Sequence, residues 1–376
     1  MPFAIAASAW GALAVGLGIG RFAFTPMLPM MQDDFGLSVA EGGWLASANY
    51  LGYLAGALSA IGLRVRPAAA IRTGLLAIGV STLAMGLTQQ FVLWLALRLV
   101  AGIASAWVLV FVSAWALERL SRAGRADLGG TVYAGVGTGI VIAGGACLVA
   151  MDAQAGSADA WFSLGLLSIA ATAAIWPLVK ASPSSDPAPA PLRSAWGVEY
   201  RRLVLCYGAF GFGYIIPATF LPVMAKAIIP DPRQFGWAWP LFGAAAFAST
   251  ICAARLTRYL SHRAVWVAGH FAMALGVAMP LLVPSLPGIL LAALLVGGTF
   301  MVITMAGMQE ARRVAGPHAH ALMAAMTSAF AAGQVLGPLA VSLLEQSTGG
   351  FAPALFLAAA VLVLSAISLW RKENPA

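Results

Sequence analysis

Long apolar runs alternate with short polar breaks along the whole chain. The runs are about twenty residues or longer, which is the length that a helix needs to cross the hydrocarbon core of a bilayer. The short alternating segments of a transmembrane β-barrel do not occur. We therefore predict an all-α membrane protein whose twelve transmembrane helices lie at residues 4–31, 41–62, 69–89, 91–118, 128–151, 160–179, 202–229, 234–257, 264–283, 288–309, 320–344 and 351–370.

Composition and charge place the chain in the membrane. Of the 376 residues, 61% are hydrophobic and 9% are charged, whereas soluble chains are about a quarter charged. The net charge of +8 does not indicate nucleic-acid binding, because 17 of the 21 Lys and Arg residues lie on one alternate set of predicted loops. The opposite set holds only Lys226 and Arg233. By the positive-inside rule, we predict a multi-pass inner (plasma) membrane protein with both termini in the cytoplasm.

Motifs of enzyme chemistry are absent from the sequence. Cys147, Cys206 and Cys252 lie inside apolar runs and show no metal or disulfide spacing, so we interpret them as packing residues. No phosphate-binding glycine loop, metal-ligand cluster or activated nucleophile is present. We predict a protein that is not an enzyme and uses no cofactor or metal.

The chain is a duplication. Residues 181–200, rich in Pro, Ala and Ser, indicate a cytoplasmic linker between six-helix bundles at 1–180 and 201–376. An offset of 193 residues aligns the two halves, and Gly135 and Gly139 pair with Gly333 and Gly337 at an offset of 198. Because each half has an even number of spans, the two predicted bundles are parallel repeats. The identities at offset 193 are Gly18, Gly20, Leu28, Pro29, Met31, Gly43 and Trp44 with Gly211, Gly213, Leu221, Pro222, Met224, Gly236 and Trp237.

This organisation resembles the major facilitator superfamily. LALRLVAGIASA, which contains Arg98, looks like the family's fourth-helix arginine motif, and AGVGTGIVIAGG looks like its glycine-rich fifth-helix motif. GIGRFAFTPMLPMMQ followed by LASANYLGYLAGAL is similar to the YbfB/YjiJ-type branch. The loop GLRVRPAAAIRTG departs from the family pattern, since it lacks an acidic residue. The resemblance implies a secondary transporter that works by alternating access between two pseudo-symmetric six-helix bundles.

Arg21 is the residue that most needs an explanation. It lies inside the apolar first span, where a cation is disfavoured by ~2.5 to 17 kcal/mol and usually faces a wet cavity or a partner. We expect Pro26 and Pro29 to weaken the helix just beyond it. At ~1.5 Å rise per residue, several other polar residues share its depth. We predict a substrate site made from Arg21, Asn49, Tyr53, Arg98, Tyr214 and Gln334.

Two arginines without an intramembrane carboxylate favour a small organic anion as the substrate, because guanidinium pairs with carboxylates. In the alternative interpretation, Arg21 and Arg98 only brace helices, and Asn49 and the tyrosines only bond neighbouring helices. A second group of positions serves gating or close helix packing. These positions are Pro26, Pro29, Gly135, Gly139, Pro222, Gly337 and Pro338.

Other functions stay open at this point. Aromatic residues and 14 methionines would also suit efflux of apolar or cationic drugs, and a membrane sensor that transports nothing is a third possibility. Proton coupling is a further option. Its candidate groups lie at the ends of the spans or within the ninth: Asp33, Asp34, Glu118, Glu310 and His270. We expect a monomer.

Overall fold

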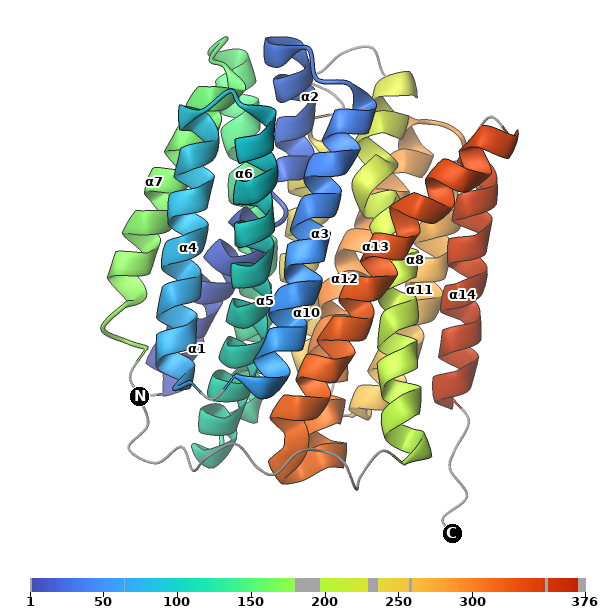
Figure 1. Ribbon diagram of the computed structural model, residues 1–376. Helices are drawn as coiled ribbons and strands as arrows, with labels where there is room; N and C mark the ends of the chain where they lie inside the picture. Colours follow the sequence, from blue (N-terminus) through green and yellow to red (C-terminus); the bar gives the residue numbers. More distant parts are fainter. Residues whose placement is uncertain are drawn as a thin grey trace.

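The computed structural model describes residues 2–63, 65–179, 197–228, 236–256, 259–348 and 351–370. Of the predicted linker 181–200, residues 181–196 lie outside these ranges. The described residues form helices and short connections, without a strand. Figure 1 shows the helices side by side, with the start of α1 and the end of α14 at the same end of the molecule.

Within the described residues, each of the twelve predicted spans contains helix, and the first span is interrupted by the turn at residues 20–23. In the N-terminal half the first span consists of α1, a π-helix η1 and α2, and the others are α3 to α7. The bounds are α1 Pro2–Leu13, η1 Ala14–Ile19, α2 Phe24–Phe35, α3 Val39–Gly62, α4 Pro67–Leu87, α5 Phe91–Arg122, the 3-10 helix η2 Ala126–Leu128, α6 Gly129–Asp152 and α7 Ser157–Ile175.

The described residues of the C-terminal half form six long helices and one short 3-10 helix, η4. Their bounds are α8 Val198–Ile228, α10 Ala238–Leu256, α11 His262–Leu282, α12 Leu286–Ala315, η4 Gly316–His318, α13 Ala319–Thr348 and α14 Ala352–Trp370. By length and composition, nine stretches of the described residues could cross a membrane, one of them running from α12 into α13. The helix α10 contains a shorter apolar stretch, Ala238–Ala253.

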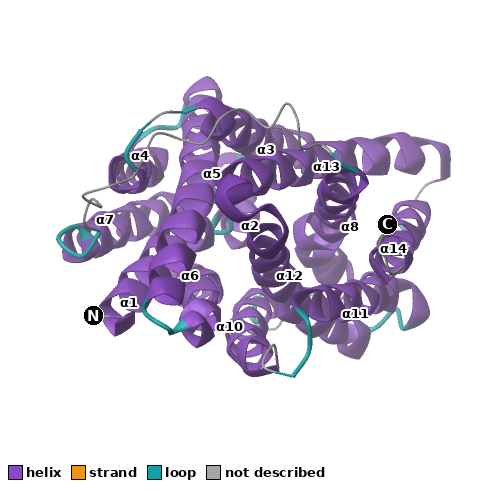
Figure 2. Ribbon diagram, turned by 90° about the horizontal axis from the view of Figure 1, so that it is seen from below, coloured by secondary structure: helices purple, strands orange, loops and turns teal. Residues whose placement is uncertain are grey.

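The helices form two bundles. Viewed along the helix axes in Figure 2, α1–α7 lie on one side and α8–α14 on the other. The halves meet mainly through two symmetric pairs of helices, α3 against α13 and α6 against α10. The second and fifth spans of each half therefore form the interface. Side chains that project between these four helices can contact both halves.

Glycines bring α6 directly against the first span. A β-carbon at Gly139 would overlap the carbonyl oxygen of Ala14 and the Cα of Gly18, and one at Gly135 would overlap the backbone of Trp10. Small residues of this kind let two helix backbones touch. The repeat position Gly337 is less constrained, because a β-carbon there would meet chiefly the side chain of Ile215.

The first span breaks at a different place from the one that we expected. The prolines lie within α2, whereas the regular helix is lost earlier, in the π-helical turns of η1 and the turn at residues 20–23. Gly20 and Phe22 donate to carbonyls five residues back, at Val15 and Leu17. Pro26 falls in the first turn of α2, where no backbone N–H has an intrahelical acceptor to lose. Pro26 therefore favours the start of α2 at Phe24, and it does not kink a helix that continues through it.

Candidate functional site

Arg21 lies in the turn between η1 and α2, and only 3% of its surface is exposed. A helix interrupted by a π-helical segment often marks a functional position, because the irregular backbone frees polar groups. The break also turns the Arg21 side chain toward the helices around it. The guanidinium is consequently enclosed by residues from both halves.

Aromatic rings surround the guanidinium of Arg21. Its central carbon lies 4.2 Å from the ring centre of Tyr53, 5.4 Å from those of Phe22 and Tyr50, and 5.6 Å from that of Phe330. Tyr50 and Tyr53 belong to α3, and Phe330 belongs to α13. Each ring face attracts the cation by roughly 0.5 to 2 kcal/mol. We call these four residues, Phe22, Tyr50, Tyr53 and Phe330, the aromatic cage.

The cage leaves the hydrogen-bonding capacity of Arg21 unused. None of its three side-chain nitrogens has a hydrogen-bond partner among the described residues. The hydroxyls of Tyr53 and Tyr214 lie close enough to the guanidinium for charge and weak hydrogen-bond interactions with it, yet neither contact has normal hydrogen-bond geometry. The amide oxygen and nitrogen of Gln334 are buried and unpartnered as well. Buried polar groups normally have partners, so this cluster is built to accept something polar.

Arg98 differs from Arg21 in its contacts. Its two terminal nitrogens donate to the carbonyl oxygens of Gly20, at 3.5 Å, and Arg21, at 3.4 Å. Asn49 reaches the same region, donating to the carbonyl of Arg98 at 3.0 Å and more weakly to that of Gly20 at 3.5 Å. Both side chains therefore stabilise the carbonyls that the break in the first span exposes.

The C-terminal half contributes a stack of aromatic rings. Tyr214 on α8 lies between Phe300 and Phe330, with ring centres 5.7 and 5.5 Å away and interplanar angles of 6° and 12°. Phe22 extends the group, since its ring contacts Phe300 edge-on at 5.5 Å. Sequence reasoning missed Phe22, Phe300 and Phe330 as site residues. Nothing in a single sequence separates them from the many aromatic residues of other spans.

Contacts between the halves lie beside the site and at one end of the bundles. Tyr50 and Thr219 share a hydrogen bond of 3.2 Å between their hydroxyls. At the end where the chain begins and ends, Arg312 on α12 donates to the carbonyl of Leu117 on α5, and the rings of Phe111 and His320 lie 5.2 Å apart. The two halves therefore touch both beside Arg21 and at the end that carries the termini.

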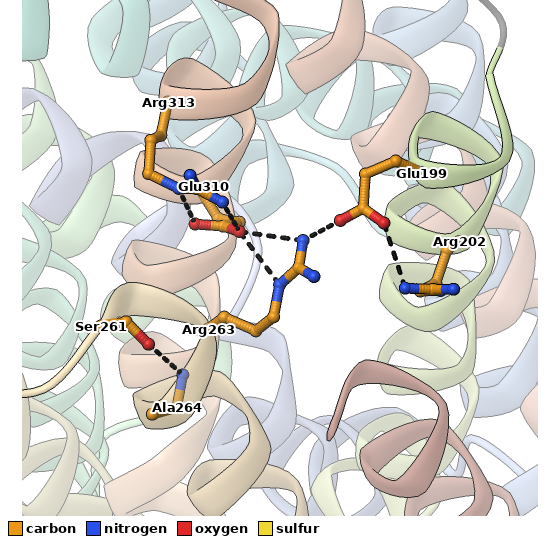
Figure 3. Close-up of polar contacts among 7 residues, drawn as sticks. All are labelled: Glu199, Arg202, Ser261, Arg263, Ala264, Glu310 and Arg313. Carbon is orange, nitrogen blue, oxygen red and sulfur yellow. Dashed lines mark hydrogen bonds and ion pairs between the residues drawn. The ribbon is translucent and has the colours of Figure 1, made fainter. Parts of the chain in front are cut away.

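A charge cluster lies at this same end, within the C-terminal half. Figure 3 shows Arg263 between two carboxylates, those of Glu199 and Glu310. Glu310 is 1% exposed and also accepts from Arg313 at 2.8 Å, while Glu199 accepts from Arg202 at 3.2 Å. The cluster ties α8, α11 and α12 together.

The other candidates for coupling have structural contacts. Asp34 accepts from the backbone N–H of Ser157 at 2.5 Å and so caps the first turn of α7. His270 is fully buried and accepts from the indole nitrogen of Trp266 at 3.3 Å. Glu118 forms an exposed ion pair with Arg122. Among the described residues, no group of three or more His, Cys, Asp or Glu side chains could hold a metal ion.

Two parallel six-helix bundles around a buried polar centre define a membrane transporter of the major facilitator type, and solved structures agree. The chain is similar to the human organic anion transporter MFSD10 (TETRAN), with a TM-score of 0.75 over 97% of this chain and 99% of that chain. The sequence identity of 16% makes this a likeness of fold.

The particular family follows from the sequence. Residues 13–369 match the family model described as uncharacterised MFS-type transporter YbfB, and the chain belongs to that family. It is also 34% identical over 94 residues to the uncharacterized MFS-type transporter YceJ of Bacillus subtilis (strain 168). That match spans about a quarter, 24%, of either protein.

Proposed function

We propose that this transporter carries a small organic anion across the membrane by alternating access and that Arg21 binds the anionic group. One observation carries the proposal: a cation enclosed between the two halves has three nitrogens without hydrogen-bond partners. Ionisable residues inside membranes are by default functional. If Arg21 were only a helix brace, its nitrogens would bond carbonyls, which is what Arg98 does.

An anion suits the surroundings better than a cation does. The groups recorded around Arg21 are aromatic rings and the hydroxyls of Tyr53 and Tyr214, and none of them is a carboxylate. A guanidinium binds a carboxylate through two parallel charge-assisted hydrogen bonds. The fold accommodates such cargo, since the similar human protein is named as an organic anion transporter.

The site residues then divide into two roles. Arg21, Tyr53 and Tyr214 would contact the substrate, because their polar atoms lie together without partners of normal hydrogen-bond geometry. Gln334 would join them, since its amide is buried and unpartnered one helical turn beyond Phe330 on α13. Arg98 and Asn49 would hold the broken first span in the shape that presents Arg21. Tyr53 comes from the N-terminal half, and Tyr214 and Gln334 come from the C-terminal half. If the two halves moved apart at one end, a site divided in this way would open toward that side of the membrane.

Orientation is part of the proposal. The end that bears the start of α1 and the end of α14 (Figure 1) would face the cytoplasm of an inner membrane, because the basic loops gather there. A monomer suffices for this mechanism, since the site lies between two halves of one chain. Coupling to a proton stays a prediction from the sequence.

Thermal stability of the purified protein tests the proposed function. Lactate, succinate, benzoate and, as cationic probes, benzylammonium and tetraphenylphosphonium would be titrated against wild type, Arg21→Gln and Arg72→Gln. Arg72 is a matched control, because its guanidinium contacts Trp176 on the outer side of the bundle. A ligand that binds the folded state raises the apparent melting temperature.

We expect at least one anion to stabilise wild type and Arg72→Gln but not Arg21→Gln. Stabilisation by the cationic probes alone, unchanged in Arg21→Gln, would overturn the anion site and favour drug efflux. For an anion that binds, counterflow into proteoliposomes then separates a transporter from a sensor that moves nothing.

A further inference from the structure

We infer that Tyr50 closes the anion site toward the end opposite the termini, through a hydrogen bond to Thr219 of the other half. This inference rests on the proposed function and adds the residue that keeps a bound anion from leaving on that side. The position of Tyr50 carries it, because one side chain contacts both Arg21 and the opposite half.

Tyr50 differs from the other two tyrosines beside Arg21. Its hydroxyl lies 3.2 Å from the hydroxyl of Thr219, whereas the hydroxyls of Tyr53 and Tyr214 have no partner of normal hydrogen-bond geometry. Tyr50 belongs to α3 and Thr219 belongs to α8, so this bond joins the two halves. The hydroxyls of Tyr53 and Tyr214 are thus available to an anion, while that of Tyr50 serves the contact between the halves.

The bond lies on one side of the site. The helix α8 begins at the end that carries the termini and runs away from it (Figure 1). Thr219 follows Tyr214 by five residues on this helix, which is ~7.5 Å along the axis. The contact at Tyr50 is therefore reached after Tyr214 on the way to the opposite end, and it lies across the route that an anion would take to that side.

The ring of Tyr50 determines where its hydroxyl can reach. The ring centre is 5.4 Å from the guanidinium carbon of Arg21, and the residue is buried. A cation is attracted to the face of such a ring. Because tyrosine has only two side-chain torsions, a guanidinium that holds the ring also directs the hydroxyl. One side chain thus connects the position of Arg21 to the contact with Thr219.

Closure and anion binding should favour each other. Parting of the halves at Tyr50 would let water reach Arg21, and closing them would remove that water from a charge. Taking an unpaired charge out of water is costly, and an anion paired with the guanidinium offsets part of that cost. A ligand that binds the closed state better shifts the population toward it. Whatever weakens closure then weakens ligand binding by up to the same factor.

The test measures closure with spin labels on the two halves. The labels are attached at Gln89→Cys, between α4 and α5, and Pro284→Cys, between α11 and α12, which are exposed positions at the end opposite the termini. The three native cysteines are replaced by alanine in this background. Double electron–electron resonance then reports the closed and open populations as short and long distances between the labels.

Four variants of the labelled protein are compared. Tyr50→Phe keeps the ring that contacts Arg21 and loses the hydroxyl, while Thr219→Val keeps the shape of the partner and loses its hydroxyl. The third variant combines the two substitutions. Tyr259→Phe is the matched control, because Tyr259 is 86% exposed.

Without ligand, we expect Tyr50→Phe and Thr219→Val each to lower the closed-to-open ratio roughly threefold to tenfold, the effect of one neutral hydrogen bond. The double variant should match either single variant, because both substitutions remove the same bond. Tyr259→Phe should leave the ratio unchanged. Benzoate should raise the ratio in the unsubstituted background, and titrations of melting temperature should show weaker benzoate binding in both single variants.

The possible failures are distinguishable. Unchanged ratios in both single variants, or effects that add in the double variant, would overturn the closing role of Tyr50 and leave the anion site standing. Lowered ratios with unaltered benzoate binding would overturn the link between closure and the anion. Binding of benzoate by Arg21→Gln with wild-type affinity would overturn the anion site itself, while the ligand-free ratios would still decide whether Tyr50 closes this end.

Discussion

In the N-terminal half the first span is broken at residues 20–23 and carries Arg21, whereas its repeat, α8, is one continuous helix from Val198 to Ile228 and carries Tyr214 at the equivalent position. Both helices keep glycines two residues apart just before that position. The same ancestral segment has therefore acquired two shapes. One presents a cation from an irregular turn, and the other presents a ring from a regular helix.

The same division extends to the neighbouring helices. Asn49 on α3 corresponds at offset 193 to Phe242 on α10. The stretch of α12 that corresponds to Arg98, residues 291–296, reads LAALLV and is wholly apolar. A broken helix exposes carbonyls and needs donors to satisfy them, and Arg98 and Asn49 supply those donors. The helix α8 has no such break at the equivalent position. Duplication thus gave a symmetric scaffold on which an asymmetric site was built.

The largest expected loss of stability concerns the packing glycines of the two halves. Gly139→Ala should lower the free energy of unfolding by about 3 kcal/mol, because the new methyl group would collide with the backbone of η1 at Ala14 and Gly18. Gly337→Ala should lower it by about 1 to 2 kcal/mol, since its methyl group would collide with one side-chain methyl group, Cγ2 of Ile215, and with no backbone atom at that distance. Unfolding of the two purified variants in detergent measures both losses of unfolding free energy. Equal losses for Gly139→Ala and Gly337→Ala would contradict this prediction.

The next largest difference in unfolding free energy concerns the charge cluster around Glu310. Among the described residues, the ion pairs with a carboxylate as buried as Glu310 lie in the C-terminal half. Glu310→Gln should lower the free energy of unfolding by about 2 kcal/mol, because a buried carboxylate would be lost between Arg263 and Arg313. Glu118→Gln, in the exposed pair with Arg122 of the N-terminal half, should lower it by less than about 0.5 kcal/mol. Denaturant titration of the two variants measures both losses of unfolding free energy. A larger loss for Glu118→Gln than for Glu310→Gln would contradict this prediction.

Substitution of Arg21 and substitution of Arg98 should change the free energy of unfolding in opposite directions. Arg98→Gln should lower the free energy of unfolding by about 1 to 2 kcal/mol, since two carbonyls would lose charged donors. Arg21→Gln should raise that of the ligand-free protein by about 1 kcal/mol, because an incompletely compensated buried charge is removed. Melting temperatures without added anion report both changes, and a fall for Arg21→Gln would mean that this residue is a brace.

The smallest expected effect concerns the repeat partner of Arg21. Tyr214→Phe removes one donor and keeps the ring, so benzoate should bind about threefold more weakly, with stability changed by less than about 0.5 kcal/mol. The melting-temperature titration with benzoate, run on wild type and Tyr214→Phe, measures this change. An unaltered benzoate affinity would exclude the Tyr214 hydroxyl from the site.

Much of the fold could be predicted from the sequence. The apolar runs predicted twelve spans because a bilayer requires helices of about twenty residues, and each predicted span proved helical. The offset of 193 residues predicted the two parallel bundles. The place where the first span breaks could not be predicted from Pro26 and Pro29, because the break depends on where the helix can restart and on what satisfies its carbonyls.

The site was harder to predict for a physical reason. Arg21 could be found without the structure, because a charged residue inside an apolar span is visible in the sequence itself. The contacts that separate it from Arg98 depend on helix rotation and on the turn at residues 20–23, which spacing does not determine. Phe22, Phe300 and Phe330 were missed because a ring that faces the centre and a ring that faces lipid look identical in one sequence.

Counterflow of radiolabelled benzoate into proteoliposomes tests the central claim, that Arg21 is the anion-binding cation of a transporter, most directly. Vesicles loaded with unlabelled benzoate and containing wild type or Arg72→Gln should transiently accumulate label, while vesicles with Arg21→Gln should behave like protein-free vesicles. Accumulation by Arg21→Gln at the wild-type rate would contradict the account.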